Sequence, residues 1–294
     1  MDSTAVSVSR GIMRKNTGFA VAGCSVGAGL AYVFVSSLRR RQQCSTFTAS
    51  SDSASDPVKT TAPHPSWRPP QKQPPPEGLD KGHVQVDPND LKSCYSLMIS
   101  SVVPRPIALT STQAPDGTVN IAPFSYFNTV GHDPPMLAVS ICRNGNGSKK
   151  DTLVNIEAKG EFVVSIMSDW FVEAANHTCG SFPPEVDEMK AAGLTPIKST
   201  IVGPPRIEES GVNMECKVRH TYDIVNKKGD VTATVVFGEV VMFHVFPHLL
   251  NKDGAGEGRP TVDLEGYLPL SRLGGNTFAR LGSVFDIPRP RVVK

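Results

Sequence analysis

The stretch NIAPFSYFNTV, from Asn120 to Val130, is the part of this sequence that decides how the fold is interpreted. It lies among segments typical of β-strands, yet it combines a proline, three aromatic side chains and two asparagines. Core strands favour β-branched residues, so this composition indicates a strand that faces a flat, polar ligand. Proline cannot donate to a sheet ladder, and Pro123 therefore predicts an edge or a bulge. A bulge would free backbone amides beside Ala122 and Phe124.

Alternation along a single strand would put Phe124 and Tyr126 on one face and Phe127 on the other, unless a bulge shifts them. Before this stretch, VVPRPIALTST (102–112) reads as a strand, and Asp116-Gly117 predicts a hairpin that pairs the two segments. After it, buried-strand patterns follow at 136–142 and 161–167, and a long hairpin at 214–246 turns at NKKGD.

Helical spacing is limited to short pieces at 151–160, 169–178 and 187–194. Asp151 and Asp169 stand where N-caps belong, and Gly160 stands where a C-cap glycine belongs. Mostly antiparallel strands with brief helices predict one mainly β domain, a closed or partly closed barrel.

The barrel domain is expected at residues 89–294, after two segments of different composition. Residues 1–41 predict a targeting segment because acidic residues are nearly absent and the uncharged run 16–38 is long enough to span a membrane. A mitochondrial presequence with an inner-membrane anchor, a secretory signal-anchor, and a cleaved leader that leaves a soluble domain all remain open. Residues 42–88 are rich in Ser and then Pro, which predicts a disordered, extended spacer.

Several function classes lack support in the sequence. Residues 1–88 carry ten Lys/Arg and six Asp/Glu, so residues 89–294 carry twenty Lys/Arg and twenty-two Asp/Glu. A domain without excess positive charge argues against a nucleic-acid partner. Neither a dinucleotide-binding G-x-G-x-x-G nor a P-loop is present. The six cysteines form no CxxC pair, and His244 and His248 lack a third nearby ligand, so no metal site is expected.

An anion site is predicted where three segments meet. Thr110, Ser111 and Thr112 end the strand that pairs with the opening stretch. The loop NGNGSKKDT (144–152) supplies glycines, a hydroxyl and two lysines directly before a helix N-terminus. Backbone amides, ammonium groups and the helix dipole together favour a phosphate. A solvated loop is the alternative for Lys149 and Lys150 alone.

The order VPRPIALTST, DGTVNIAPFSYFN, DPPMLAVSI, SKKDTLVNI and GEFVVSIM closely resembles the flavin reductase-like domain family, and further matches reach the terminal RPR. The resemblance covers about residues 88–290. It implies an antiparallel, Greek-key split β-barrel, FMN bound at or near a homodimer interface, and a reduced nicotinamide, NADH or NADPH, as reductant.

The resemblance also implies which residues bind the cofactor. The phosphate or ribityl chain is assigned to Thr110, Ser111, Thr112, Ser148, Lys149, Lys150, Asp151 and Thr152. The isoalloxazine ring is assigned to Asn120, Ala122, Pro123, Phe124, Ser125 and Asn128. Arg105 and Arg272 are expected behind these contacts or across the dimer, and Asn176 to Thr178 match a segment that can close over the flavin, with His177 as the one catalytic candidate.

The expected activity is hydride transfer from NAD(P)H to flavin N5, which needs no general base from the protein. Two alternatives stay open: a membrane-tethered FMN electron carrier without its own NAD(P)H activity, and an FMN oxidoreductase that acts on an organic substrate such as an amine or a quinone.

Overall fold

A computed structural model describes residues 56–78, 82–251 and 259–290 of the chain. Short 3-10 helices lie at Pro88–Asp90 and Asp169–Phe171. The α-helices are α1 (Tyr95–Ser101), α2 (Asp151–Lys159), α3 (Val172–His177) and α4 (Glu188–Ala191). The strands of the main sheet are β3 (Ala108–Gln113), β4 (Val119–Phe124), β5 (Phe127–His132), β6 (Pro135–Cys142), β7 (Glu161–Ile166), β10 (Val212–Val225) and β11 (Val231–Val245).

Two-residue strands complete the architecture as small pairs outside the main sheet. They are β1 (Val58–Lys59), β2 (Arg105–Pro106), β8 (Pro196–Ile197), β9 (Arg206–Ile207), β12 (Leu250–Asn251), β13 (Thr261–Val262), β14 (Ser271–Arg272), β15 (Phe278–Ala279) and β16 (Ser283–Val284).

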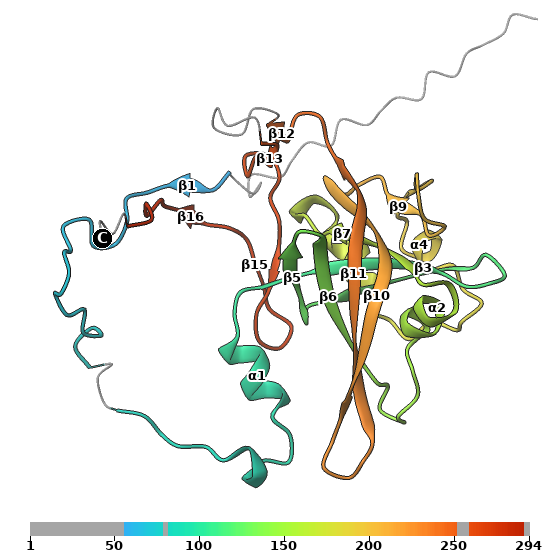
Figure 1. Ribbon diagram of the computed structural model, residues 1–294, viewed down its shortest axis with the longest axis horizontal. Helices are drawn as coiled ribbons and strands as arrows, with labels where there is room; N and C mark the ends of the chain where they lie inside the picture. Colours follow the sequence, from blue (N-terminus) through green and yellow to red (C-terminus); the bar gives the residue numbers. More distant parts are fainter. Residues whose placement is uncertain (1–55, 79–81, 252–258, 291–294) are drawn as a thin grey trace, which may run out of the picture. The chain divides into compact units, whose positions relative to one another are not determined.

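The main sheet has the order β4-β3-β7-β10-β11-β6-β5, and all of its neighbours pair antiparallel. β4 and β5 follow each other in the chain but form opposite edges of the sheet. β5, β6, β11 and β10 lie side by side in a curved sheet (Figure 1). β4, at the other edge of the sheet, approaches β6, so the barrel is split between its two edges. The predicted mainly β, antiparallel split barrel is confirmed.

The opening stretch is therefore two strands instead of one. The chain leaves β4 at Phe124 and enters β5 at Phe127, so Asn120–Val130 bridges the split in the barrel. Pro123 does lie on an edge strand, but β3 and β4 pair without any register shift, and the predicted bulge is wrong. The alternation across Phe124, Tyr126 and Phe127 fails because no single strand contains them: Phe124 and Phe127 both pack in the core, and Tyr126 is exposed.

The long hairpin of β10 and β11 lies in the middle of the sheet and confirms the hairpin predicted for 214–246. It turns at Asn226–Asp230, where Gly229 has a φ of 90° that favours glycine. Gly238 in β11 meets the ring of Phe162 in β7, and a Cβ at this position would collide with that ring. A glycine at this position lets the buried phenylalanine cross the centre of the barrel.

Two hydrophobic cores lie on opposite faces of β3 and β4. The first fills the barrel and includes Ala108, Phe124 and Phe162, with α2 contributing Leu153 and Ile156. The second lies outside the barrel, where Leu109 and Ile121 pack with residues of α3 and α4. The alternation of these two strands thus assigns Thr110, Thr112, Asn120 and Ala122 to the inner face, and Ser111 to the outer face.

The three predicted helices are confirmed, with small corrections at their starts. Lys150, not Asp151, is the N-cap of α2, and Asp151 is its first helical residue. Ser168 precedes the short helix at Asp169, which runs into α3. Gly160 ends α2 in the left-handed conformation, as predicted, with a φ of 68°.

The predicted leader at 1–41, with its candidate span at 16–38, lies outside the described residues. None of the helices in the described ranges is long and apolar enough to cross a membrane. Part of the predicted spacer has a partner, because β1 pairs in parallel with β16 and Lys59 lies 2.8 Å from Asp286.

Candidate functional site

A cavity of about 610 Å³ opens beside the edge strand β4. β4 contributes Asn120, Ala122, Pro123 and Phe124 to its wall. The loop before α2 and the first turn of that helix form a second wall, the segment 178–182 forms a third, and Glu188 of α4 completes it. Its size is within the usual range for small-molecule sites, which is about 300–1,000 Å³.

The loop before α2 is shaped by its own hydrogen bonds. The backbone amide of Asn144 donates to the Ser148 carbonyl at 2.9 Å, and Gly147 donates back to the Asn144 carbonyl at 2.8 Å. The Ser148 hydroxyl donates to Asn146 Oδ1 at 2.7 Å, so it is used within the loop. This turn presents Gly145 and Asn146 to the cavity immediately before the positive end of the α2 dipole.

Lys149 and Lys150 have different environments. Lys149 Nζ is paired with Glu157 of α2, at 2.6 Å from Oε2, and it does not line the cavity. Lys150 does line the cavity, and its Nζ lies 3.3 Å from Asn144 Oδ1. The structure therefore separates the two lysines, and only Lys150 supplies positive charge to this space.

The edge of β4 meets the carboxylate of Glu188. The Ile121 amide, which points away from the sheet, donates to Glu188 Oε2 at 2.7 Å. With its amide group oriented to satisfy its neighbours, Asn120 donates to the same oxygen at 3.2 Å and accepts from the Thr152 hydroxyl at 2.8 Å. Asn120, Thr152 and Glu188 thus form one polar chain across the cavity wall.

Glu188 is only 7% exposed, and burial raises its pKa from 4.5 to about 7. The Ile121 amide opposes this shift, the acids Asp151 and Asp187 add to it, and Lys150 lowers the pKa. Near neutral pH this carboxyl therefore exists in both protonation states.

The third wall follows α3 and includes Thr178, Cys179, Gly180, Ser181 and Phe182. His177 is exposed and does not line the cavity, but its ring packs edge-on against Phe182 at 5.5 Å. Burial raises the pKa of the Cys179 thiol, while Arg272 and Lys150 act to lower it. Asn176 lines a separate hollow beside α3.

Thr110, Ser111 and Thr112 of β3 are fully buried and do not line the cavity. The Thr112 hydroxyl accepts from Asn155 at 3.2 Å, and the Thr110 hydroxyl lies 3.4 Å from the Ala108 carbonyl. Ser111 Oγ is on the other face of the strand and has no hydrogen-bond partner among the described residues. Direct ligand contacts by these three residues remain predictions.

Arg105, Ser125 and Asn128 line a second hollow of about 340 Å³, which α1 and β5 border. Arg105 is buried and donates to the carbonyls of Val102 at 2.6 Å and Leu273 at 2.7 Å, so it links α1 to the segment after β14. Arg272 lies over the ring of Phe278, 4.4 Å from its centroid. The structure thus brings Asn120, Ala122, Pro123, Phe124, Lys150, Asp151 and Thr152 to one cavity and divides the other predicted residues among its surroundings.

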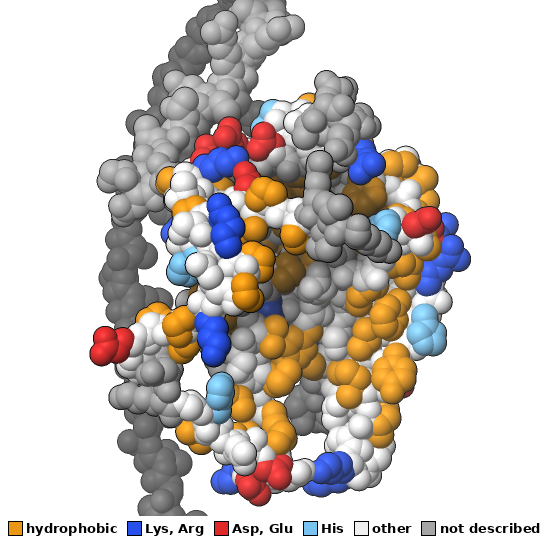
Figure 2. Space-filling model, turned by 60° about the vertical axis from the view of Figure 1, so that its left-hand side comes forward, with side chains coloured by type: hydrophobic (Ala, Val, Ile, Leu, Met, Phe, Trp, Pro, Cys, Tyr) orange, Lys and Arg blue, Asp and Glu red, His pale blue; other side chains and the backbone are white. Residues whose placement is uncertain are grey.

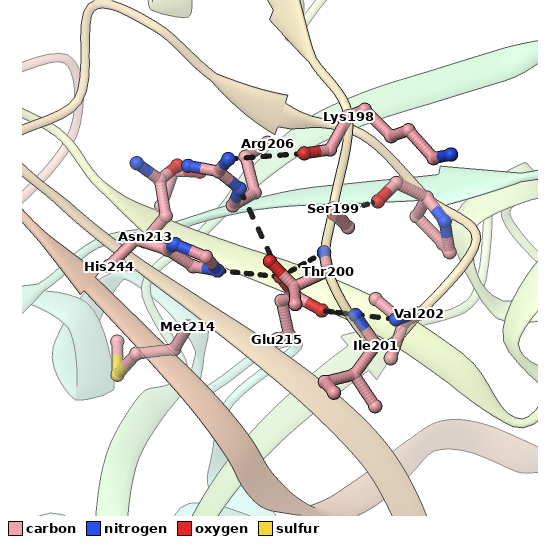
Figure 3. A network of polar contacts seen from close by, with 12 residues as sticks. Lys198, Ser199, Thr200, Ile201, Val202, Arg206, Asn213, Met214, Glu215 and His244 are labelled. Atoms are coloured by element: carbon pink, nitrogen blue, oxygen red, sulfur yellow. Dashed lines mark hydrogen bonds and ion pairs between the residues drawn. The ribbon is translucent and has the colours of Figure 1, made fainter.

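A second buried carboxylate, Glu215 of β10, lies outside this cavity. It accepts the backbone amides of Thr200, Ile201 and Val202 at 2.7, 2.6 and 3.0 Å, and His244 Nε2 lies 2.6 Å from Oε1 (Figure 3). Burial acts to raise the pKa of Glu215, but the amides and His244 outweigh it, and the pKa lies below its ordinary value. This carboxylate fixes the loop between β8 and β9 to the barrel.

Sequence reasoning missed Glu188 and the wall 179–182, whereas the turn at Gly145–Asn146 belongs to the loop 144–152 that it predicted. An acid at the start of a short helix has an ordinary explanation in the helix dipole, so Glu188 gave no separate signal. Only the packing of α4 against β4 brings it to the cavity.

The donor set of the cavity suits a flat ligand that carries an anion. Lys150 and the first amides of α2 lie at one side, and Ala122, Pro123, Phe124 and Phe182 offer apolar wall. No group of side chains able to hold a metal ion occurs within residues 56–78, 82–251 and 259–290.

The family model described as "Flavin reductase like domain" matches residues 99–259. An uncharacterized protein of Halalkalibacterium halodurans is 37% identical over 71% of this chain and 98% of its own length. Nitrilotriacetate monooxygenase component B from Bacillus cereus is similar at 36% identity and a TM-score of 0.65, over 70% of this chain and 99% of that one.

Two further structures are similar at lower identity. The 2-nitrobenzoate 2-nitroreductase NbaA of Pseudomonas fluorescens matches at 28% identity and a TM-score of 0.62, over 72% of this chain and 98% of that one. A protein with a split barrel domain from Shewanella frigidimarina, at 20% identity and a TM-score of 0.58 over 69% of this chain and 96% of that one, supports the fold alone.

Proposed function

Because the chain belongs to the flavin reductase-like domain family, we propose that it is an FMN-binding oxidoreductase that uses NADH or NADPH as its reductant. Family membership supports a flavin-related oxidoreductase. FMN as the cofactor and a nicotinamide as the reductant are the finer parts of the proposal. The observation that carries it is a cavity in which Lys150 and the N-terminus of α2 meet the edge strand β4.

The residues of the cavity fit FMN in two ways. Lys150 and the amides of the first turn of α2 would bind the phosphate through charge-assisted hydrogen bonds. Ala122, Pro123, Phe124 and Phe182 would contact the isoalloxazine ring and exclude water from it. When bound, FMN supplies hydride acceptance at N5.

The polar chain of the wall would orient the ligand. Asn120 is held by Thr152 and Glu188, so its position is fixed before any ligand enters. Fixed polar groups reduce the entropy that is lost on binding. Thr112 would act indirectly through Asn155 of α2, Arg105 through the carbonyls of Val102 and Leu273, and His177 through its contact with Phe182.

We test this with the full-length protein. FMN fluorescence should be quenched on binding, and riboflavin, which lacks the phosphate, should bind at least tenfold more weakly. Anaerobic addition of NADH or NADPH should then bleach the flavin absorbance. Equal affinity for riboflavin would overturn the phosphate site, and a protein that takes up no FMN would overturn the proposed function.

A second candidate function is reduction of an organic substrate by the bound flavin. The similarity to a 2-nitrobenzoate 2-nitroreductase favours it. Turnover of 2-nitrobenzoate with FMN at one equivalent would support this candidate. Turnover that requires excess free flavin, and that stalls without it, would support the flavin reductase.

The partner that we propose for this domain is a second copy of itself. Hydrophobic side chains gather on the side of the molecule that carries α1 and the second hollow (Figure 2). The exposed apolar residues there include Met98 of α1, Val102 at the C-cap of that helix, Tyr126 before β5 and Val130 of β5. A dimer would cover this face, and light scattering after gel filtration tests it: a monomer at micromolar concentration would contradict it.

The mitochondrial and membrane-anchor predictions for residues 1–41 are also part of the proposal, supported by their composition alone. Carbonate extraction of a tagged full-length protein distinguishes an anchored form, which stays with membranes, from a released one.

A further inference from the structure

Glu188 has no role in the proposed hydride transfer, yet it is a buried acid in the wall of the ligand cavity. Its Oε2 accepts from the Ile121 and Asn120 amides. Its Oε1 has no hydrogen-bond donor among the described residues. This second oxygen is not one of the buried atoms that lack a partner, so it opens to the cavity. An ionised carboxylate that faces the space of an anion is an unfavourable arrangement, because like charges repel.

The charges that face Glu188 come from each element packed around it. Asp187 stands next to it at the start of α4, and Asp151 and Lys150 face it from the start of α2. β4 presents only the uncharged Ile121 amide and Asn120. Cys179 lines the same cavity from the third wall. Asp187 is paired with Lys190 at 3.0 Å and does not line the cavity. Within the cavity one lysine, Lys150, therefore stands with two carboxyl groups, Asp151 and Glu188, in a site that must attract an anion.

We propose that Glu188 takes up a proton when an anionic ligand enters the cavity, so that the site binds phosphate-bearing ligands in a proton-coupled manner. Protonation removes the repulsion between the carboxylate and the ligand, and it turns the free oxygen into a group that can donate a hydrogen bond. The inference rests on the proposed function in assigning the ligand as FMN, and it adds Glu188 as a positioning residue that controls affinity.

The environment of the carboxyl supports this coupling. Burial already holds its pKa near 7 without a ligand, so the proton is available at neutral pH. A phosphate beside Lys150 would add negative charge close to Glu188 and would raise the pKa further, because like charges disfavour ionisation. By linkage, the ligand must then bind more tightly to the protonated form.

The test compares the FMN affinity of the full-length wild type and of Glu188→Gln between pH 5.5 and 8.5. The phosphate of free FMN titrates equally in both measurements, so the ratio of the two dissociation constants isolates Glu188. We expect a ratio near 1 at pH 5.5 and a wild type that binds about tenfold more weakly than Glu188→Gln at pH 8.5. Glu185→Gln, which removes an exposed acid from the same segment, is the matched control and should leave the ratio constant.

Sulfate provides a second readout that does not depend on FMN, because its charge is constant over this pH range. Sulfate should raise the melting temperature of the wild type more at pH 5.5 than at pH 8.5, and that of Glu188→Gln equally at both. A ratio for FMN that does not change with pH overturns the coupling even when FMN binds. Sulfate binding with this pH dependence but without FMN binding overturns the proposed function and supports the coupling, and absence of both overturns both.

Discussion

Glu188 and Glu215 are the two acids buried among the described residues, and their surroundings are opposite. Glu215 receives three backbone amides and His244, and Arg206 lies 3.9 Å away. Glu188 receives the Ile121 and Asn120 amides, and two further acids face it. The pKa of the first is lowered and that of the second is raised.

This difference shows how a buried carboxylate that stabilises the fold can be distinguished from one that serves a ligand site. Both oxygens of ionised Glu215 have hydrogen-bond partners in the protein, so few acceptor positions remain for a ligand. Incomplete pairing leaves Glu188 with an oxygen and a proton that a ligand can use. The following predictions test that contrast, beginning with the largest expected effect.

Removing Glu215 should cost the most stability. Glu215→Ala leaves three backbone amides and His244 without their acceptor, and we expect a loss of about 3–5 kcal/mol in the free energy of unfolding. Glu188→Ala should lower the free energy of unfolding by less than half as much, because it leaves fewer hydrogen-bond donors without an acceptor. Urea denaturation at pH 7 measures both, and equal losses would contradict the contrast.

Lys150→Ala should weaken FMN binding by about 1.5–3 kcal/mol, because a charge-assisted contact is lost. Lys149→Ala is the matched control: its ammonium group is paired with Glu157 outside the cavity, and FMN affinity should change by less than about 0.5 kcal/mol. Fluorescence titration compares the two variants. A larger effect of Lys149→Ala would show that the phosphate binds elsewhere on this loop.

The pH dependence of stability should differ between the two acids. Because the folded pKa of Glu188 is raised from 4.5 to about 7, its contribution is fully present below pH 4.5 and is lost as the pH rises through 7. Glu188→Gln should therefore gain about 1–2 kcal/mol relative to the wild type between pH 5 and 8, with allowance for water in the cavity.

Glu215 should show the opposite sign. Its folded pKa is lowered, so its contribution is present above pH 4.5 and is lost as the pH falls through the folded pKa. The stability difference between the wild type and Glu215→Gln should shrink below pH 4.5. A difference that grows on acidification would contradict the account of the Glu215 cluster.

The smallest effect is expected at Ser111, a buried hydroxyl without a partner. Ser111→Ala should leave FMN affinity unchanged and should stabilise the fold by up to about 1 kcal/mol. Ser165→Ala is the control, because the Ser165 hydroxyl is equally buried but donates to Asn213 at 2.6 Å, and its loss should destabilise. Weaker FMN binding by Ser111→Ala would instead support the direct contact between Ser111 and the ligand that the family resemblance implies.

Much of the fold could be predicted because its signals are local. The Asp116-Gly117 turn pairs β3 with β4, and Gly160 ends α2 as its position indicates. The break between β4 and β5 at Ser125–Tyr126 could not be read locally, because the two halves of one aromatic stretch belong to opposite edges of a curled sheet.

The cavity could be predicted where sequence neighbours supply it, as in the segments around Asn120–Phe124 and Lys150–Thr152. It could not be predicted where tertiary packing decides. Glu188 reaches the cavity because α4 packs on β4. Lys149 does not line the cavity because its ammonium group is paired with Glu157 of α2. Neither fact has a signature in residue spacing.

Hydrogen exchange of the full-length protein with and without FMN tests the central claim most directly, because it locates the ligand. We predict slower exchange on FMN binding in peptides that cover 120–128, 144–152 and 178–182, and unchanged exchange in 198–206, the loop that Glu215 holds. Protection at 198–206, or bound FMN without protection of the cavity segments, would contradict the account.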